Sequence, residues 1–440
     1  MEKKTLMYII IIISLILLLG VLWYFIITDT NTPNMNRPEQ MNNNNISYSA
    51  SKEITSEEDI NEGEFTSSNS DENVISVSGD IKSTLSNITV SKTGDSDGGD
   101  NTSFYGTNSG IIAKDGATLT IKNATITTDA TGANGVFSYG GSATTNNSSS
   151  DNTTINISNS TITTSKDNSG GIMTTGGGIM NATNLTITTA GTSSAAIRSD
   201  RGGGTATVNK GTYKTTGKGS PAIYSTADIT VKNATLISTS SEGAIIEGKN
   251  SITLENVELT DTNNQLNGQS TTYKNVFLYQ SMSGDAAEGK AVFTSKNSTI
   301  TTNKGDSFYV TNTTAEINLE NNTIINNDKE GNFLRIQKDS WGNSGSNGGT
   351  VTLNLTSQEV NGNIVVDEIS SLTMNMTSSS FKGIIDAKNG KVKLKLDKSS
   401  TITLTGDSYI ESLDNEDTTN SNINLNGYKL YIGGNEYKAN

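Results

Sequence analysis

A short sequence pattern recurs along this chain and constrains its fold more than any other feature. Alternating apolar residues lead into Asn-x-Thr, which is followed by another aliphatic residue, as in Leu119–Ile126 and Ile229–Leu236. Most copies start about 24 residues after the previous one, a period typical of solenoids built from stacked coils. The aligned asparagines are Asn123, Asn159, Asn184, Asn233, Asn256, Asn297 and Asn321, and Lys210 occupies the same place in one further copy.

The pattern predicts an all-β fold, a single-stranded parallel β-helix whose coils each contain two or three short strands. The apolar residues alternate with polar ones in runs rich in Ile, Val, Leu and Thr, as half-buried strands require. Asparagine tolerates the left-handed backbone of a tight corner, and its amide can bond to the amide of the next coil. We therefore expect a structural ladder of asparagines that Lys210 interrupts once.

The N-terminus predicts a membrane anchor. A stretch of 21 almost entirely apolar residues, Met7–Ile27, follows two lysines. Such a stretch spans a bilayer as a helix, and the preceding lysines place the rest of the chain outside the cell. No small-residue cleavage site follows, which favours an uncleaved, single-pass signal anchor with a cytoplasmic N-terminus in the cell membrane. The expected domains are a cytoplasmic stub and transmembrane anchor at 1–29, a flexible polar and acidic stalk at 30–70, and a β-helix ectodomain at 71–440.

Composition excludes several classes of function. The formal net charge is -14, and no basic face with interleaved aromatic residues is present, which argues against a nucleic-acid partner. The chain has no Cys, so disulfides, thiolate zinc sites and lipid attachment through Cys are excluded. It also has no His, which removes the commonest general base and the commonest transition-metal ligand.

Aligning the first strand of each coil predicts which of its side chains face the core. The expected inward residues are Ile111, Val136, Ile172, Ile197, Ile223, Ile245, Leu278, Phe308 and Leu334. The next residue of each strand points outward because strand side chains alternate. The expected outward column is Ile112, Phe137, Met173, Arg198, Tyr224, Ile246, Tyr279, Tyr309 and Arg335. Exposed stripes of this kind mark interaction sites, and the alternative is a minor hydrophobic cluster that loops cover.

Three insertions interrupt the repeat. Residues 139–151 follow Phe137, and residues 338–349, which contain Trp341, follow Arg335. Both insertions leave the same corner near opposite ends of the outward column, where they are placed to wall a groove. The third insertion, 261–274, leaves a different corner and is expected to be a plain polar loop.

These observations favour a cell-surface adhesin or glycan-binding protein, because aromatic faces pack on pyranose rings and arginine forks onto acidic groups. The candidate ligand-binding residues are Phe137, Arg198, Asp200, Arg201, Tyr224, Glu247, Tyr279, Tyr309, Arg335 and Trp341. One alternative is a polysaccharide lyase or hydrolase. Glycoside hydrolysis needs two carboxylates at a defined separation, and no acidic pair recurs in adjacent coils, so a salt bridge of Asp200 is favoured over catalysis. The other alternative is a purely structural protein of the cell envelope.

Calcium is the one cofactor that the sequence brings into question. Asp95, Asp97 and Asp100 place three carboxylates in a glycine-rich loop, a pattern that offers oxygen ligands to calcium. The loop lacks the distal glutamate of an EF-hand, which favours a solvated turn.

Several phrases resemble those of a group of uncharacterised microbial adhesin-like cell-surface proteins. The phrases are Ala133–Gly141 (ANGVFSYGG), Ser193–Gly204 (SSAAIRSDRGGG), Ser220–Asp228 (SPAIYSTAD) and Leu278–Asp285 (LYQSMSGD). The resemblance covers about residues 73 to 415. It implies a right-handed parallel β-helix at the cell surface, and it carries no assigned catalytic residues.

Overall fold

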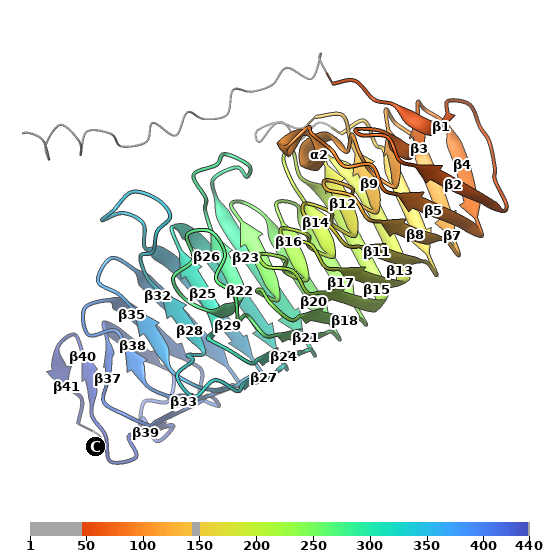
Figure 1. The fold of residues 1–440 in the computed structure, drawn as a ribbon. Helices are drawn as coiled ribbons and strands as arrows, with labels where there is room; N and C mark the ends of the chain where they lie inside the picture. The colour runs from red at the N-terminus through yellow and green to blue at the C-terminus, as the bar shows by residue number, and fades with distance from the viewer. Residues whose placement is uncertain (1–45, 143–149, 439–440) are drawn as a thin grey trace, which may run out of the picture. The chain divides into compact units, whose positions relative to one another are not determined.

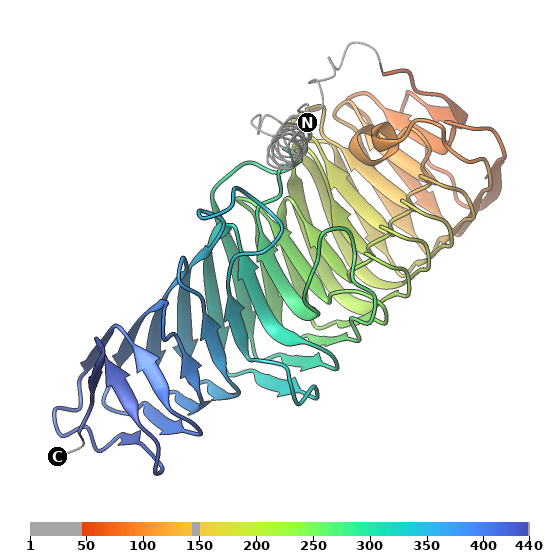
Figure 2. The same cartoon turned by 60° about the vertical axis from the view of Figure 1, so that its left-hand side comes forward.

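The computed structural model describes residues 46–142 and 150–438. Within these ranges the chain winds into a long stack of coils made of parallel strands (Figures 1 and 2). Coils contribute strands to three faces, and a strand pairs with the equivalent strands of the coils before and after it. The predicted all-β fold with long parallel sheets is therefore confirmed, and the architecture is consistent with a β-helix.

The first face is a 13-stranded sheet followed by a three-stranded end sheet. The strands of the 13-stranded sheet are β1 (Ala50–Ile54), β3 (Asn73–Ser78), β6 (Ile111–Lys114), β9 (Val136–Tyr139), β12 (Ile172–Thr175), β14 (Ile197–Ser199), β16 (Ile223–Ser225), β19 (Ala244–Glu247), β22 (Lys274–Tyr279), β25 (Asp306–Thr311), β28 (Leu334–Ile336), β31 (Ile364–Val366) and β34 (Ile385–Asp386). The end sheet holds β37 (Ser408–Ile410), β40 (Leu430–Ile432) and β41 (Asn435–Glu436), and β41 is antiparallel to β40.

The second face carries the strand that leads into each asparagine corner. Its strands are β4 (Lys82–Ser86), β7 (Thr118–Lys122), β10 (Thr154–Ser158), the first halves of β13 (Gly178–Thr189) and β15 (Gly204–Thr215), β17 (Asp228–Lys232), β20 (Ser251–Glu255), β23 (Lys290–Lys296), β26 (Thr313–Glu320), β29 (Gly349–Thr356), β32 (Ser371–Thr377), β35 (Lys391–Leu396) and β38 (Ser412–Asn415).

The third face carries the strand that follows each corner. Its strands are β2 (Gly63–Ser67), β5 (Ile88–Lys92), β8 (Thr125–Thr128), β11 (Thr161–Thr164), the second halves of β13 and β15, β18 (Thr235–Ser238), β21 (Glu258–Asp261), β24 (Thr299–Thr302), β27 (Thr323–Asn326), β30 (Glu359–Asn361), β33 (Ser380–Gly383), β36 (Thr401–Leu404) and β39 (Ile423–Asn424). Because β13 and β15 run through the corner, the second and third faces are joined into one 21-stranded sheet there.

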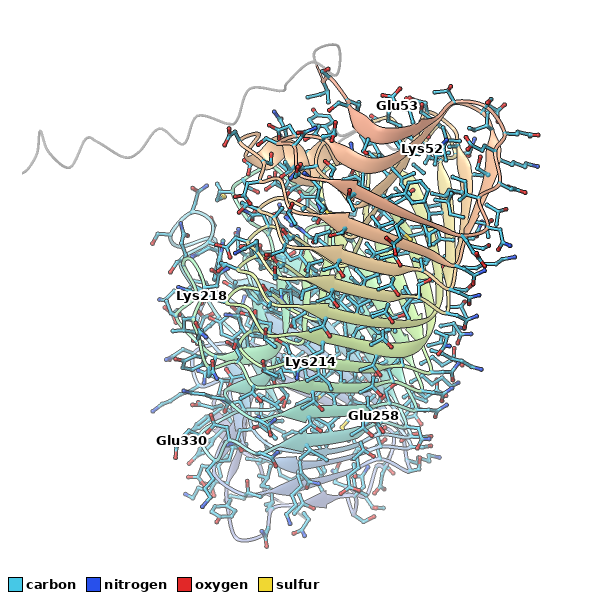
Figure 3. All side chains as sticks on the ribbon, turned by 45° about the vertical axis from the view of Figure 1, so that its right-hand side comes forward. Lys52, Glu53, Lys214, Lys218, Glu258 and Glu330 are labelled. Atoms are coloured by element: carbon cyan, nitrogen blue, oxygen red, sulfur yellow. The ribbon has the colours of Figure 1, made fainter. Side chains whose placement is uncertain are left out.

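The core fills the space between the three faces. Alternate strand residues point inward and are buried, as in β10, where Ile155 and Ile157 alternate with partly exposed polar residues. Their neighbours point outward, and Figure 3 shows the dense outer layer that such side chains form, with Lys214 and Glu258 on the third face. One continuous hydrophobic cluster runs from Ile54 to Leu430. Each coil thus buries its apolar side by stacking on its neighbours, as the repeat predicted.

The corner between the second and third faces is built on asparagine, as predicted. The seven aligned asparagines have φ between 50° and 55°. Their amides bond between coils: Asn184 Nδ2 donates to Asn159 Oδ1 at 2.9 Å. Lys210 adopts the same left-handed backbone with φ of 64°. There Asn233 Nδ2 donates to Asn209 Oδ1 at 2.8 Å. The residue before the lysine therefore supplies the acceptor that an asparagine at position 210 would provide.

The folded coils begin earlier than the sequence predicted. Residues 50–67, which we expected in a flexible stalk, contribute β1 and β2 to the first and third faces. Ile54 is buried, Glu53 and Glu64 point outward, and Lys52 pairs with Glu58 at 2.7 Å, so acidic residues are compatible with an outer strand surface. The predicted anchor and residues 30–45 lie outside the described residues. In the described ranges, no helix is long and apolar enough to span a membrane.

Candidate ligand site on the first face

Strand pairing places one outward residue of each central first-face strand in a single vertical file. The file contains Ile112, Phe137, Met173, Arg198, Tyr224, Ile245, Phe277, Tyr309 and Arg335. We call it the outer file. It agrees with the predicted column except in β19 and β22, where Ile245 and Phe277 replace Ile246 and Tyr279.

The error has a local cause. In β19, Ala244 rather than Ile245 lies next to Ile223, which shifts the alternation by one residue and buries Ile246 in the core. Tyr279 still points outward, two residues after Phe277, and it pairs with Glu247 in a second file further along the strands. Asp200 and Thr226 lie just past the ends of β14 and β16, where Thr226 Oγ1 donates to the Asp200 carbonyl at 2.9 Å.

The N-terminal end of the outer file is covered by a short helix, α2 (Asp100–Tyr105), which lies over β9 in Figure 1. Phe104 and Tyr105 of this helix pack with Ile112, Phe137 and Met173, each of which is 0% exposed. The expectation of an exposed stripe is therefore wrong at this end. Phe137 belongs to a small hydrophobic cluster and does not reach the surface.

The C-terminal end of the outer file is covered by the insertion that holds Trp341. The rings of Phe277 and Tyr279 stack with centroids 4.5 Å apart, and Trp341 packs 5.3 Å from each of them. Tyr309 is 0% exposed, and its hydroxyl donates to Asp339 Oδ2 at 2.6 Å. Tyr309 is thus also buried, contrary to expectation. Arg335 lies beyond this cover and pairs with Asp306 at 2.5 Å.

The third insertion is not a plain polar loop. Thr271 Oγ1 donates to Asp339 Oδ1 at 2.9 Å, which joins this loop to the loop that carries Trp341.

Between the two covers lies a partly exposed polar patch, which we call the central patch. Arg198 Nη2 pairs with Asp200 Oδ2 at 3.1 Å and also donates to Ser103 Oγ of α2 at 3.2 Å. Arg201 pairs with Asp285 at 2.7 Å, and its guanidinium lies 4.0 Å from the centroid of the Phe104 ring. The two arginines are therefore held from both sides, and 11% and 14% of their side chains remain exposed.

Glu247 lies at the bottom of the central patch and is 1% exposed. Three hydroxyl groups donate to its carboxylate: Tyr279 at 2.9 Å, Tyr224 and Ser281. No lysine or arginine forms an ion pair with it among the described residues. A buried carboxylate that only hydroxyls compensate is costly, which distinguishes this group from an ordinary surface acid.

Burial perturbs both carboxyl groups of the patch. It raises the pKa of Asp200 to about 7, although the Arg198 guanidinium opposes the rise. It also raises the pKa of Glu247 against the opposing hydrogen bonds from Ser281 and the two tyrosines. Two acids with raised pKa values thus lie two coils apart in the patch, and the charge of Glu247 adds to the rise at Asp200.

The structure brings together Arg198, Asp200, Arg201, Tyr224, Glu247 and Tyr279. It leaves Phe137, Tyr309 and Trp341 in the two covers and Arg335 beyond them. Sequence reasoning missed three members of the patch: Ser103 on α2, and Ser281 and Asp285 in the loop after β22. The phrase Leu278–Asp285 held the only signal for them.

In the loop that carries Asp95, Asp97 and Asp100, the three carboxylates are not arranged around a common centre that could hold calcium. Asp95 Oδ1 accepts a hydrogen bond from the Thr131 N–H at 2.7 Å, and Asp100 is the first residue of α2. Across residues 46–142 and 150–438, no three His, Cys, Asp or Glu side chains are arranged to hold a metal ion. The sequence favours a solvated turn over a calcium site, and calorimetric titration with calcium tests that interpretation.

Comparison with known proteins adds no further constraint on this site. No protein-family model, curated protein or solved structure matches the chain.

Proposed function

We propose that this protein is a membrane-anchored, right-handed β-helix of the cell surface that acts as an adhesin by binding a glycan at the central patch. The observation that carries the proposal is the gap between the two covers. The outer file is buried at both ends, but in the gap Arg198, Tyr224 and Tyr279 stay partly exposed. The anchor and the kinship with adhesin-like proteins rest on the sequence alone.

The chemistry of the patch suits a sugar that carries acidic groups. Tyrosine rings present apolar faces to pyranose rings, and the guanidinium groups of Arg198 and Arg201 suit carboxylates or sulfates. Asp200 and Glu247 offer acceptors for sugar hydroxyls. The exposed side chain of Met282, which is 50% accessible, borders the same loop and adds apolar contact.

A glycan array probed with the full chain tests the proposal. Binding should be lost in the double variant Tyr224→Ala with Tyr279→Ala. The matched control is Tyr409→Ala with Tyr431→Ala, which removes a stacked pair of tyrosines, 4.9 Å apart, at the far end of the first face. An array without any ligand, or equal loss in both double variants, contradicts glycan binding at the central patch.

A second candidate function is glycoside hydrolysis, and the observation that favours it is the presence of two buried acids with raised pKa values, Asp200 and Glu247, in the central patch. Inverting glycosidases hold an acid and a base about 6.5–9.5 Å apart, with room for a water molecule between them. Glu247, which lacks a cation, is suited to be the proton donor, and Asp200, beside Arg198, is suited to be the base.

Hydrolysis is tested by incubating the protein with a series of polysaccharides and measuring new reducing ends. Glu247→Gln and Asp200→Asn should each abolish release and leave binding intact. Glu255→Gln, on the exposed second face, is the control. Release that survives Glu247→Gln rules out this mechanism.

A further inference from the structure

A second polar cluster lies where the third face turns into the first, away from the central patch. Strands β19 and β22 pair in register, and just before them the Gly243 N–H donates to the Asn275 carbonyl at 3.0 Å. The same register brings Glu242 opposite Lys274, at about 4.8 Å between the two backbones. On its other side, the backbone of Lys274 lies opposite that of Asp306 in the pairing of β22 with β25. A lysine is thus held between two carboxyl groups of neighbouring coils.

Lys274 is fully buried, which is rare for lysine. Its Nζ lies 3.7 Å from Glu242 Oε1, and it donates to Ser270 Oγ at 2.7 Å and to the Thr272 carbonyl at 2.9 Å. Three aromatic rings surround this nitrogen, with centroids 4.3, 5.1 and 5.8 Å away: those of Phe277, Tyr309 and Trp341. Burial lowers the pKa of Lys274, while the carboxylate of Glu242 opposes the change. Relative to an exposed lysine, burial thus shifts Lys274 towards its neutral, nucleophilic form.

Asp261, the last residue of β21, completes the cluster. It is 0% exposed, and within the described ranges its Oδ1 atom has no hydrogen-bond partner. Ser238 and Thr302 occupy the equivalent position in the coils on either side, and the Ser238 hydroxyl donates to the Ser241 carbonyl at 3.0 Å. Burial raises the pKa of Asp261 well above its usual range, and the charge of Glu242 adds to the rise. The raised pKa shifts this carboxyl towards its protonated form. Asn263 links it to the pair, because the Asn263 N–H donates to Asp261 Oδ2 at 3.2 Å and its side-chain amide donates to the Lys274 carbonyl at 2.9 Å.

We propose that Lys274 and Glu242 react to form an intramolecular amide bond, which cross-links two neighbouring coils. Lys274 Nζ attacks the Glu242 carboxyl carbon, and the new N–C bond forms as one C–O bond breaks. The departing oxygen leaves as water. Asp261 accepts a proton from the nitrogen and supplies one to the departing oxygen, so it ends the reaction unchanged. The condensation releases one water molecule overall and needs no oxidant, reductant or cofactor.

Contacts favour Glu242 over Asp306 as the partner. Both oxygens of Asp306 are already bound, Oδ2 by Arg335 at 2.5 Å and Oδ1 by the Asn332 amide at 2.7 Å. Ser241 Oγ donates to Glu242 Oε2 at 2.6 Å, and no other described residue donates a hydrogen bond to Oε1, the oxygen that faces Lys274.

Burial also favours the product. The side chains of Lys274 and Glu242 are 0% and 4% exposed, so the ion pair carries a large desolvation cost. A neutral amide removes both charges from the low-dielectric interior. Lys274 also lies in the longest interval between aligned corner residues, counting Lys210 among them, which runs from Asn256 to Asn297. An adhesin that bears load would gain most from a covalent tie at such an interruption.

Mass spectrometry of the full chain tests the cross-link without any variant. The intact mass should fall one water molecule below the mass of the sequence. Trypsin does not cleave after an acylated lysine, so digestion should yield one branched product that contains Glu242 and an uncleaved Lys274. Recovery of the full sequence mass, with Glu242 and Lys274 in separate, unmodified peptides, overturns the proposal.

Variants separate the three roles. Lys274→Ala, Glu242→Ala and Asp261→Asn should each restore the full mass of their own sequence, the last because asparagine cannot relay protons. Lys290→Ala is the control, because the Lys290 ion pair with Glu316 is exposed and should leave the loss of water intact. A loss of water that persists in Lys274→Ala shows that the modification lies elsewhere and contradicts the assignment. The result does not depend on glycan binding.

Discussion

The pKa of Asp200 makes the stability of the protein depend on pH in a way that one substitution should remove. The folded-state pKa is about 7, and the ordinary value is 3.8. Because the folded state keeps the proton over this range and the unfolded chain releases it, stability falls as pH rises from about 4 to about 7 and then levels off. A difference of about three pKa units corresponds to about 4 kcal/mol at pH 8.

Asp200→Asn keeps the size of the side chain and cannot ionise. We expect the free energy of unfolding of the wild type, relative to that of Asp200→Asn, to fall by about 4 kcal/mol between pH 4 and pH 8. Urea unfolding of both proteins at each pH measures this difference. Taking the difference between two proteins cancels the other titrating groups, including Glu247, that they share.

Tyr213→Phe is the control for this experiment. It removes the hydrogen bond from the Tyr213 hydroxyl to the Lys210 carbonyl at 3.1 Å, and it removes no carboxyl group. Its effect on stability should be equal at pH 4 and pH 8. If the pH profiles of the wild type and Asp200→Asn are parallel, the argument from burial of Asp200 is wrong.

Three further predictions concern the scaffold, and urea unfolding measures each of them. Asn233→Ala should cost about 2 kcal/mol, because alanine is strained at φ of 54° and lacks the side-chain hydrogen bond to the neighbouring coil. Asn233→Gly should cost less, and equal losses would contradict the role of the backbone. Lys210→Asn should stabilise the protein by some tenths of a kcal/mol, since asparagine suits the left-handed corner better than lysine does; a loss would show that the ladder does not extend there. Phe137→Ala should cost about 3–5 kcal/mol although Phe137 faces away from the main core. Thr125→Ala, on the exposed third face, should change stability by less than about 0.5 kcal/mol. A small effect of Phe137→Ala would mean that α2 does not cover the N-terminal end of the outer file.

The coils and their corners could be predicted from the sequence, because both follow from local chemistry. Each corner needs a residue with a left-handed backbone, and asparagine supplies it at a regular spacing, so the sequence alone predicts the ladder. The first coil was missed for the opposite reason. Its acidic residues resemble a solvated spacer, and only pairing with β3 and β5 shows that they lie on the outside of strands.

The candidate site could be predicted only in part. The phrase Ala244–Ile246 contains two consecutive isoleucines, so either one satisfies the alternation, and the choice depends on the neighbouring coils. The cover at the N-terminal end could not be foreseen, because α2 is too short to show a helical period. Whether an outward aromatic is a ligand contact or a packed side chain therefore depended on segments whose position the repeat does not determine.

The asparagine ladder implies that the scaffold and the central patch respond differently to changes in the number of coils. Each coil contacts mainly its two neighbours, so duplication or loss of one complete coil leaves every remaining corner with an equivalent partner. Tyr224, Glu247 and Tyr279 come from three successive coils and bond to one another across them. Evolution can thus add or remove coils along most of the stack. Deletion of a coil between Arg198 and Asp285, in contrast, would leave a folded protein without its polar network.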